Sequence, residues 1–165
     1  MANLEMSKEE GNVNDSRQDL FALPKSYALA HCIARNVGAS RGTASVFRRK
    51  FGRFDELNLQ HPTVGKALHL QDQNQNRFYL VTKDQPQEES TYQTLWQSLM
   101  HLRTHLQFLG VEQLGIPRLG CGYDGLEWKI VRPMIGRIFK DTGISGTCCV
   151  YNPWAATPAD PSKPA

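Results

Sequence analysis

The sequence predicts an α/β domain in which helices cover a central mixed sheet. Short apolar runs of strand length occur at residues 27–33 and 114–116. Two longer segments, which begin near residues 90 and 128, carry apolar residues at helical spacing. Strand and helix patterns alternate along most of the chain, and this alternation is typical of layered α/β domains. Ligands in such domains bind beyond the carboxyl ends of the strands.

Length and composition fit one folded domain. The chain has 165 residues, of which 40% are hydrophobic, enough for one ordinary core. We expect residues 1–16 to form a flexible leader, residues 17–154 to fold, and the Pro- and Ala-rich residues 155–165 to be disordered. Residues 12–16 are poor strand formers, so no strand is expected before Asp19.

Charge and cysteine content exclude several classes of function. The net charge of +3 is too small to indicate nucleic-acid binding, and the basic residues 48–50 fit a solvated helix face. The four cysteines lack zinc-site spacing, so no metal is expected and the thiols are expected to be reduced. Neither a signal-peptide pattern nor a run of about 20 apolar residues occurs, so no membrane association is expected. We expect an intracellular monomer, in the nucleus or cytoplasm, without a cofactor.

The first half of the chain contains three predicted strands and one predicted helix. The apolar residues 27–33 fit a strand buried on both faces. A helix is expected at residues 43–50, and residues 52–65 are expected to be irregular. Residues 66–70 and 77–82 have strand-like composition and are joined by a polar stretch, so they predict a hairpin.

The second half contains the clearest helices. Ser90 opens a capping-box pattern and predicts the start of a helix that stops at Gly110. A second helix is expected from Trp128, with Pro133 either kinking it or lying in its first turn. Residues 147–151 are the last predicted strand. The apolar stripes are assigned to the core; they consist of Leu95, Leu99, Leu102, Leu106 and Leu109, and of Trp128, Val131, Ile135, Ile138 and Phe139.

A glycine-rich stretch between a predicted strand and a predicted helix is the most informative part of the sequence. It contains glycines at positions 120, 122 and 125 and an acid at position 124. A turn of this kind can place several backbone N–H groups around a phosphate. Asp124 would then lie beside the ligand, where a carboxylate can act as base or acid. The spacing alone fits equally a tight strand-to-helix turn with Asp124 as the N-cap.

The full string from Pro117 to Trp128, Pro-Arg-Leu-Gly-Cys-Gly-Tyr-Asp-Gly-Leu-Glu-Trp, resembles the second ligand loop of macrodomains. It is most similar to the branch of terminal ADP-ribose protein glycohydrolases. Three further stretches, residues 18–25, 30–33 and 79–83, agree with that branch in order and spacing. The resemblance covers roughly residues 17–153 and implies a three-layer αβα macrodomain with a central mixed sheet.

The resemblance also implies the catalytic residues. Lys83 matches the lysine that forms a covalent adduct with the distal ribose, which divides one difficult step into two easier ones. An amine attacks carbon only when it is unprotonated, so burial or nearby positive charge must favour the neutral amine. Asp124 would relay protons and help to resolve the adduct. Without the resemblance, a lone lysine after a strand fits a solvated charge, and His31 fits a hydrogen-bonded core histidine with no chemical role.

The resemblance implies a ligand-binding set as well. Asp19 would accept a hydrogen bond from the adenine amino group, although a turn aspartate that caps its own backbone is the alternative. Backbone N–H groups of the glycine-rich loop would hold the diphosphate. Arg118 could assist or pair with a surface acid, and Cys121 is read as a small packed residue. The complete set is Asp19, Leu20, Gly42, Arg118, Leu119, Gly120, Cys121, Gly122, Tyr123, Asn152 and Pro153.

Two departures from the family pattern lie near the expected chemistry. Ser40-Arg41-Gly42 stands where macrodomains usually carry a Gly-Ala-Gly-type turn, and Ala34 stands where this branch usually has serine. The expected function is removal of ADP-ribose from glutamate and aspartate side chains of mono-ADP-ribosylated proteins, together with deacylation of O-acyl-ADP-ribose. The alternative is a reader that binds ADP-ribose without turnover. The departures affect turnover more than binding, so they are what keeps the alternative open.

Overall fold

The computed structural model describes residues 13–36, 49, 52–122 and 124–151. Most of the helix expected at residues 43–50 lies outside these ranges. The same is true of part of the expected ligand-binding set, namely Gly42, Tyr123, Asn152 and Pro153, and of the variant residues Ser40 and Arg41.

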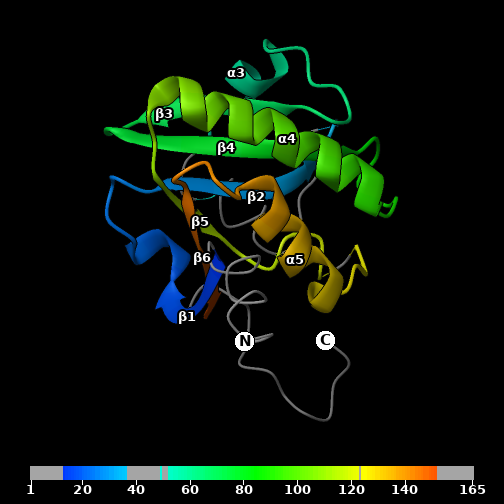
Figure 1. Ribbon diagram of the computed structural model, residues 1–165. Coiled ribbons are helices and arrows are strands. Elements are labelled where there is room, and N and C mark those ends of the chain that lie inside the picture. The colour runs from blue at the N-terminus through cyan, green and yellow to red at the C-terminus, as the bar shows by residue number, and fades with distance from the viewer. Residues whose placement is uncertain (1–12, 37–48, 50–51, 123, 152–165) are drawn as a thin grey trace.

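A six-stranded sheet forms the centre of the domain (Figure 1). Its strands are β1 (Val13–Asp19), β2 (Ala28–Ala34), β3 (Ala67–Asp72), β4 (Gln75–Lys83), β5 (Gln113–Ile116) and β6 (Ser145–Tyr151). They lie in the order β1-β6-β5-β2-β4-β3. β3 runs antiparallel to β4, and the other neighbouring pairs are parallel, so the sheet is mixed as the sequence predicts.

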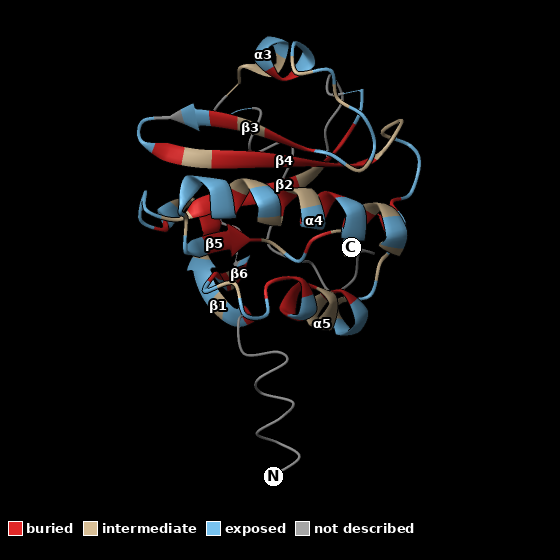
Figure 2. Ribbon diagram, turned by 45° about the horizontal axis from the view of Figure 1, so that its top comes forward, coloured by how far each residue is buried: buried red, intermediate tan, exposed pale blue. Residues whose placement is uncertain are grey.

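Helices cover both faces of the sheet. They are η1 (Leu20–Ala22), α3 (Phe54–Asn58), α4 (Tyr92–Leu109) and α5 (Trp128–Ile138). Figure 2 shows α3 on one side of β3 and β4, with α4 and α5 on the other. This arrangement confirms the expected three-layer architecture. None of the described helices is long and apolar enough to cross a membrane.

Two cores lie on opposite faces of the sheet, and β4 contributes to both. Phe78 and Leu80 of β4 are buried against α4 and α5. Tyr79 and Val81 are buried on the other face with Leu57 of α3. Alternation of side chains along a strand buried on both sides produces this division. The α4 stripe is confirmed except at its end, since Leu95, Leu99, Leu102 and Leu106 are fully buried but Leu109 is 40% exposed.

The expectation that no strand precedes Asp19 is wrong. β1 begins at Val13, within the expected leader, and pairs in parallel with β6. Val13 is its only buried residue, so backbone hydrogen bonds to β6 hold this edge strand where side-chain burial does not. Arg132 of α5 adds a bond from its Nη2 to the Val13 carbonyl at 2.9 Å. Strand propensity is mostly a measure of side-chain burial, and therefore misjudges such a segment.

The predicted hairpin is confirmed, and its turn is tighter than expected. β3 and β4 are joined at Gln73 and Asn74, which have φ values of 51° and 66°. Two positive φ values match the twist of a two-residue hairpin turn.

The stretch 52–65 is less irregular than expected, because α3 forms within it and buries Leu57 completely.

The start of α4 differs from the prediction, whereas α5 begins at Trp128 as predicted. Thr91 is the N-cap of α4, and it forms the capping box with Thr94, so the expected box at Ser90 is wrong by one residue. Gly110 ends the helix with φ 69°, as predicted. Pro133 lies inside α5 rather than in its first turn. The apolar stripe predicted for the second helix is confirmed, because Val131, Ile135, Ile138 and Phe139 are buried and Trp128 is half-buried. β6 confirms the last predicted strand.

Candidate active site

The carboxyl ends of five parallel strands meet at one edge of the sheet. The residues that end these strands lie in the order of the sheet, namely Asp19, Tyr151, Ile116, Ala34 and Lys83. Sequence segments more than 100 positions apart therefore meet on one surface. This edge is where layered α/β domains bind their ligands.

Lys83 ends β4 next to an irregularity in the sheet. Ile33 pairs with Val81 and Ala34 pairs with Lys83, so Thr82 is an extra residue on β4. A β-bulge of this kind reorients the side chains that follow it, and bulges are frequent beside active sites. Here the irregularity lies between the buried residues of β4 and Lys83, the last residue of the strand.

The side chains of Lys83 and Asp124 form an ion pair. Lys83 Nζ lies 2.7 Å from Asp124 Oδ1, and the two side chains are 13% and 10% exposed. A charge-assisted bond of this length, largely removed from water, fixes both groups more firmly than a surface pair would. The structure thus brings together the two residues predicted to be catalytic.

The other oxygen of Asp124 is held by a buried hydroxyl pair that the sequence did not reveal. Ser90 Oγ donates to Asp124 Oδ2 at 2.8 Å, and Thr82 Oγ1 lies 2.6 Å from Ser90 Oγ. Ser90 has one hydroxyl proton, which it gives to the carboxylate, so Thr82 is the donor in the second bond. Both carboxylate oxygens are therefore oriented by named donors.

The N-terminus of α4 ties this hydroxyl pair to the sheet. Thr94 Oγ1 donates to the Thr82 carbonyl at 2.7 Å. The same hydroxyl also accepts from the Thr91 backbone N–H at 3.2 Å, as part of the capping box. The start of α4 and the end of β4 are thus held together, which explains why the capping box falls at Thr91. Ser90 remains outside the cap and is available to Asp124.

Gly120 and Gly125 of the loop after β5 both have a positive φ, and Gly120 is also crowded by a neighbouring side chain. The φ of Gly120 is 72°, and a Cβ there would lie 2.7 Å from Cδ1 of Leu126. The Leu126 N–H donates to the Gly120 carbonyl at 2.9 Å and closes the loop. A Cβ at Gly122 would meet no atom within 4 Å, so the backbone there is open to the approach of a ligand.

The loop's own hydrogen bonds limit which N–H groups can hold a phosphate. The backbone N–H groups of Gly120, Cys121 and Gly122 are the expected donors, and that of Cys121 is already bonded to the Arg118 carbonyl at 3.1 Å. The alternative role of Asp124 as a helix N-cap is wrong, because Glu127 occupies that position. The Glu127 N–H in turn donates to Tyr92 Oη at 3.1 Å.

Two side chains at the start of the loop after β5, those of Arg118 and Leu119, pack against neighbouring residues. The guanidinium carbon of Arg118 lies 5.9 Å from the centre of the Trp128 ring, a cation–π contact that fixes neither of the two roles considered for it. Leu119 is buried in the core that includes α4 and α5.

The cysteines near the site are not poised as nucleophiles. Burial, and then the negative charge of Asp124, raise the pKa of Cys32 to about 12. Burial raises the pKa of Cys121 to about 11 although Arg118 opposes this. Thiols with such pKa values are protonated near neutral pH, and only the thiolate is strongly nucleophilic. The reading of Cys121 as a packed residue is consistent with its Sγ, which donates to the Leu119 carbonyl at 3.3 Å.

Asp19 ends β1 and opens the short helix η1. Its Oδ1 accepts from the Phe21 N–H at 3.0 Å, so it caps its own turn. The second carboxylate oxygen leaves room for a further hydrogen bond. Leu20, which follows it, is buried. Asp19 lies at the far end of the strand-end row from Lys83.

Solved structures with the same fold were found by comparison of coordinates. The macrodomain of Mycobacterium tuberculosis DarG superposes with a TM-score of 0.74 at 19% identity, covering 86% of this chain and 97% of that one. Thermosipho africanus DarTG in complex with ADP-ribose has a TM-score of 0.70 at 21% identity, covering 91% of this chain and 44% of that one. No family model matches the sequence.

A sequence relative decides the family. Human ADP-ribose glycohydrolase OARD1 is 36% identical over 146 residues, which covers 88% of this chain and 96% of that protein. The chain belongs to the macrodomain family. Its six-stranded sheet is the macrodomain sheet, and the ion pair of Lys83 with Asp124 stands at the carboxyl edge of this macrodomain.

Proposed function

We propose that this macrodomain binds ADP-ribose and hydrolyses its ester bond to glutamate and aspartate side chains of proteins. The observation that carries the proposal is the ion pair between Lys83 Nζ and Asp124 Oδ1 at 2.7 Å. It joins a nucleophile and a base at the edge where α/β domains bind ligands. The 36% identity to a protein named ADP-ribose glycohydrolase supports the same reaction class.

The order of groups along the sheet edge fits an extended ligand. Asp19 stands at one end, the loop of Gly120 and Gly122 is in the middle, and Lys83 is toward the other end. ADP-ribose has the corresponding order of adenine, diphosphate and distal ribose. In this orientation Asp19 accepts from the adenine amino group, loop N–H groups bind the diphosphate, and Lys83 reaches the anomeric carbon of the distal ribose.

The reaction begins with transfer of a proton from Lys83 to Asp124. The lone pair of Nζ then attacks the anomeric carbon, and the acceptor carboxylate leaves with the electron pair of the broken C–O bond. The adduct nitrogen loses a proton to solvent. Water attacks the same carbon while Asp124 returns its proton to the departing amine, and the proton left by water restores the ion pair. Ser90 orients Asp124 throughout these transfers.

A second candidate function is binding without turnover. Ala34, which pairs in register with Lys83, stands where the glycohydrolase branch usually has serine. Ser40 and Arg41 add bulk where small residues usually approach the distal ribose. A misplacement of about 1 Å at the reacting carbon can cost about 100-fold in rate, so these residues could leave binding intact while turnover is lost.

Two measurements test the proposal. Calorimetry with ADP-ribose is expected to give a micromolar dissociation constant, on the order of −8 kcal/mol. Incubation with a protein that carries glutamate-linked mono-ADP-ribose is expected to release free ADP-ribose, and O-acetyl-ADP-ribose is expected to be deacylated. Binding without release would favour the reader. Absence of heat and of a melting shift at millimolar ADP-ribose would refute both functions.

A further inference from the structure

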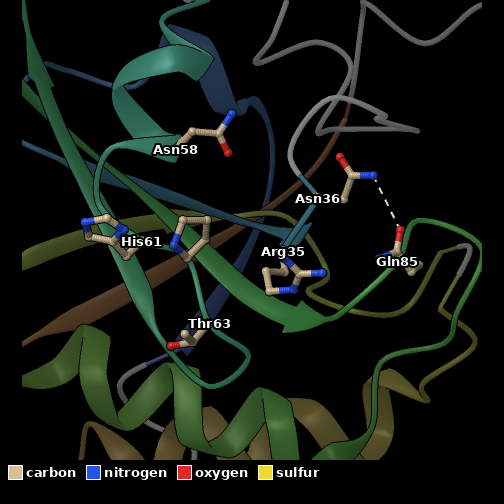
Figure 3. A pocket seen from close by; sticks show the side chains of 7 residues that line it. Arg35, Asn36, Asn58, His61, Thr63 and Gln85 are labelled. Carbon is tan, nitrogen blue, oxygen red and sulfur yellow. Dashed lines mark hydrogen bonds between the residues drawn. The ribbon is translucent and has the colours of Figure 1, made fainter.

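A polar pocket of about 510 Å³ lies beside the candidate active site (Figure 3). Its volume is within the range of about 300–1,000 Å³ that small-ligand sites occupy. Side chains with amide, hydroxyl and imidazole groups dominate the lining as far as the structure describes it, and none of the described residues of the loop after β5 belongs to it. The lining residues are Arg35, Asn36, Asn58, His61, Pro62, Thr63 and Gln85.

One wall of the pocket is the direct continuation of β2 and β4 beyond Lys83. The Arg35 N–H donates to the Lys83 carbonyl at 2.8 Å, and the Asn36 N–H donates to the Asp84 carbonyl at 3.2 Å. Asn36 Nδ2 donates to Gln85 Oε1 at 3.4 Å, as Figure 3 shows. The wall therefore begins at the residue that is proposed to attack the ribose.

The opposite wall is the segment between α3 and β3. Gln60 fastens it to the sheet, because its side-chain amide donates to the His69 carbonyl at 2.8 Å and accepts from the His69 N–H at 3.1 Å. Leu57, three positions earlier, is fully buried. His61 has φ 55°, a left-handed conformation that side chains adopt when the surroundings impose it. Both walls are thus held in place before any ligand binds.

The sheet order sets where this pocket stands relative to ADP-ribose. The loop that would hold the diphosphate follows β5, on one side of β2. The pocket is built from the ends of β2 and β4 and from the segment that leads into β3, so it extends toward the opposite edge of the sheet. Lys83 ends β4, and its carbonyl is bonded to the pocket wall at the Arg35 N–H. A substrate that runs from Asp19 past the diphosphate loop to Lys83 continues, beyond its anomeric carbon, toward this pocket.

We propose that this pocket binds the polypeptide on either side of the modified acidic residue. The inference rests on the proposed function, since it takes the anomeric carbon to lie at Lys83. Asn36, Asn58 and Gln85 carry side-chain amides, which have the same kinds of donor and acceptor as peptide groups. Two of these amides already bond within the wall, because Asn36 Nδ2 donates to Gln85 Oε1 and Gln85 Nε2 donates to Asp84 Oδ2 at 3.0 Å.

The charge of the lining favours a polypeptide over a nucleic acid. Among the described residues of the lining, Arg35 is the one arginine, and its Nε donates to the Asp84 carboxylate, which neutralises its charge. Binding of a nucleic-acid strand relies on lysine and arginine side chains that neutralise its phosphates. A neutral lining rich in amides matches a peptide backbone better.

Asn58 is the position at which to test the pocket. It is exposed at the end of α3, so its replacement does not disturb the core. Asn58→Ala removes a hydrogen-bonding side chain, and Asn58→Trp fills the space. Gln107→Ala and Gln107→Trp, at an exposed amide of α4, are the matched controls. Each variant is assayed with a glutamate-linked ADP-ribosyl peptide and with O-acetyl-ADP-ribose, whose leaving group is too small to reach the pocket.

We expect Asn58→Trp to lower kcat/KM for the peptide at least about tenfold, and Asn58→Ala about threefold. Hydrolysis of O-acetyl-ADP-ribose should stay within twofold, as should both activities of the Gln107 variants. An unchanged rate with the peptide, or an equal loss with both substrates, would overturn the inference. Selective loss with an ADP-ribosylated DNA oligonucleotide, but not with the peptide, would also overturn it.

Failure of the proposed function has a different signature, which is absence of turnover of both substrates by the unmodified protein. In that case, the dissociation constants of the ADP-ribosyl peptide and of free ADP-ribose decide the matter. Tighter binding of the peptide, reduced to the level of ADP-ribose by Asn58→Trp, supports the pocket. Equal dissociation constants in the unmodified protein reject it.

Discussion

Asp124 Oδ1 accepts from Lys83 Nζ at 2.7 Å while Asp124 Oδ2 accepts from Ser90 Oγ at 2.8 Å. One carboxylate therefore joins the end of β4, the start of α4 and the loop after β5. A proton can pass between Lys83 and Asp124 without rearrangement of either side chain. The hydroxyl of Ser90 keeps the carboxylate in place when the lysine turns to a substrate.

Lys83→Ala should abolish turnover and leave ADP-ribose binding intact. In the proposed reaction the lysine acts on one carbon of the substrate, whereas the loop backbone and Asp19 would supply most of the binding. We expect kcat to fall at least about 1,000-fold and the dissociation constant to stay within about threefold. Release of ADP-ribose from a glutamate-linked protein measures the first and calorimetry the second. Lys140→Ala removes an exposed lysine and serves as the control; normal activity in Lys83→Ala would rule out the lysine mechanism.

Ser90→Ala should reduce kcat about 10- to 100-fold with little change in KM, because it frees one oxygen of Asp124. Ser98→Ala is the matched control. Ser98 is buried like Ser90 but lies within α4, and its Oγ donates to the Val81 carbonyl at 3.0 Å and not to Asp124. Ser90→Thr retains the hydroxyl and should recover part of the rate. Equal losses in Ser90→Ala and Ser98→Ala would mean that the effect is structural.

Gly120→Ala should destabilise the loop and weaken ADP-ribose binding. Its φ of 72° and the contact of 2.7 Å with Leu126 mean that a methyl group forces the loop to move. We expect a loss of about 1–3 kcal/mol in the free energy of unfolding, measured with urea. Gly122→Ala, which meets no atom within 4 Å, should change stability by less than about 0.5 kcal/mol. Similar stabilities for the two variants would contradict the assignment of Gly120 as the strained position.

His31 should make stability depend on pH below neutrality. Burial lowers the pKa of His31 to about 3, from an ordinary value of 6.5. The unfolded chain therefore binds a proton that the folded chain refuses between these values, and stability falls as the pH drops through this window. Between pH 7 and pH 5 we expect this group to remove about 2 kcal/mol. His31→Phe should flatten the dependence by that amount in urea titrations; parallel curves for both proteins would show that His31 does not contribute.

Ala34→Ser should increase kcat several-fold. Ala34 is 4% exposed and pairs in register with Lys83, so a hydroxyl there would lie beside the attacking amine. It would restore the residue that the glycohydrolase branch usually has at this position. Ala30→Ser adds the same hydroxyl to the same strand, inside the core, and should reduce stability without a gain in rate. A fall in kcat with Ala34→Ser would show that alanine at this position does not limit the proposed turnover.

The sequence by itself determined the layered fold and the two charged residues of the site. Hydrophobic periodicity locates β2, the hairpin and α4, because each buries a regular pattern of side chains. The sequence also indicates the glycine-rich loop, because Gly120 adopts a backbone conformation that other residues avoid. The family resemblance of the segments around Lys83 and Asp124 added their roles, which spacing alone could not supply.

Only the tertiary structure decided the strand at Val13–Asp19, the partners of Asp124 and the pocket beside Lys83. β1 is held by backbone bonds to β6, and backbone groups carry no sequence signal. Ser90 fits a helix cap in the sequence, but the capping box at Thr91 leaves its hydroxyl for a carboxylate 34 positions away. The pocket joins the ends of β2 and β4 to the segment after α3, and their proximity follows from the strand order of the sheet. Local patterns record what each segment buries, whereas the meeting of polar groups from distant segments depends on how the chain crosses the sheet.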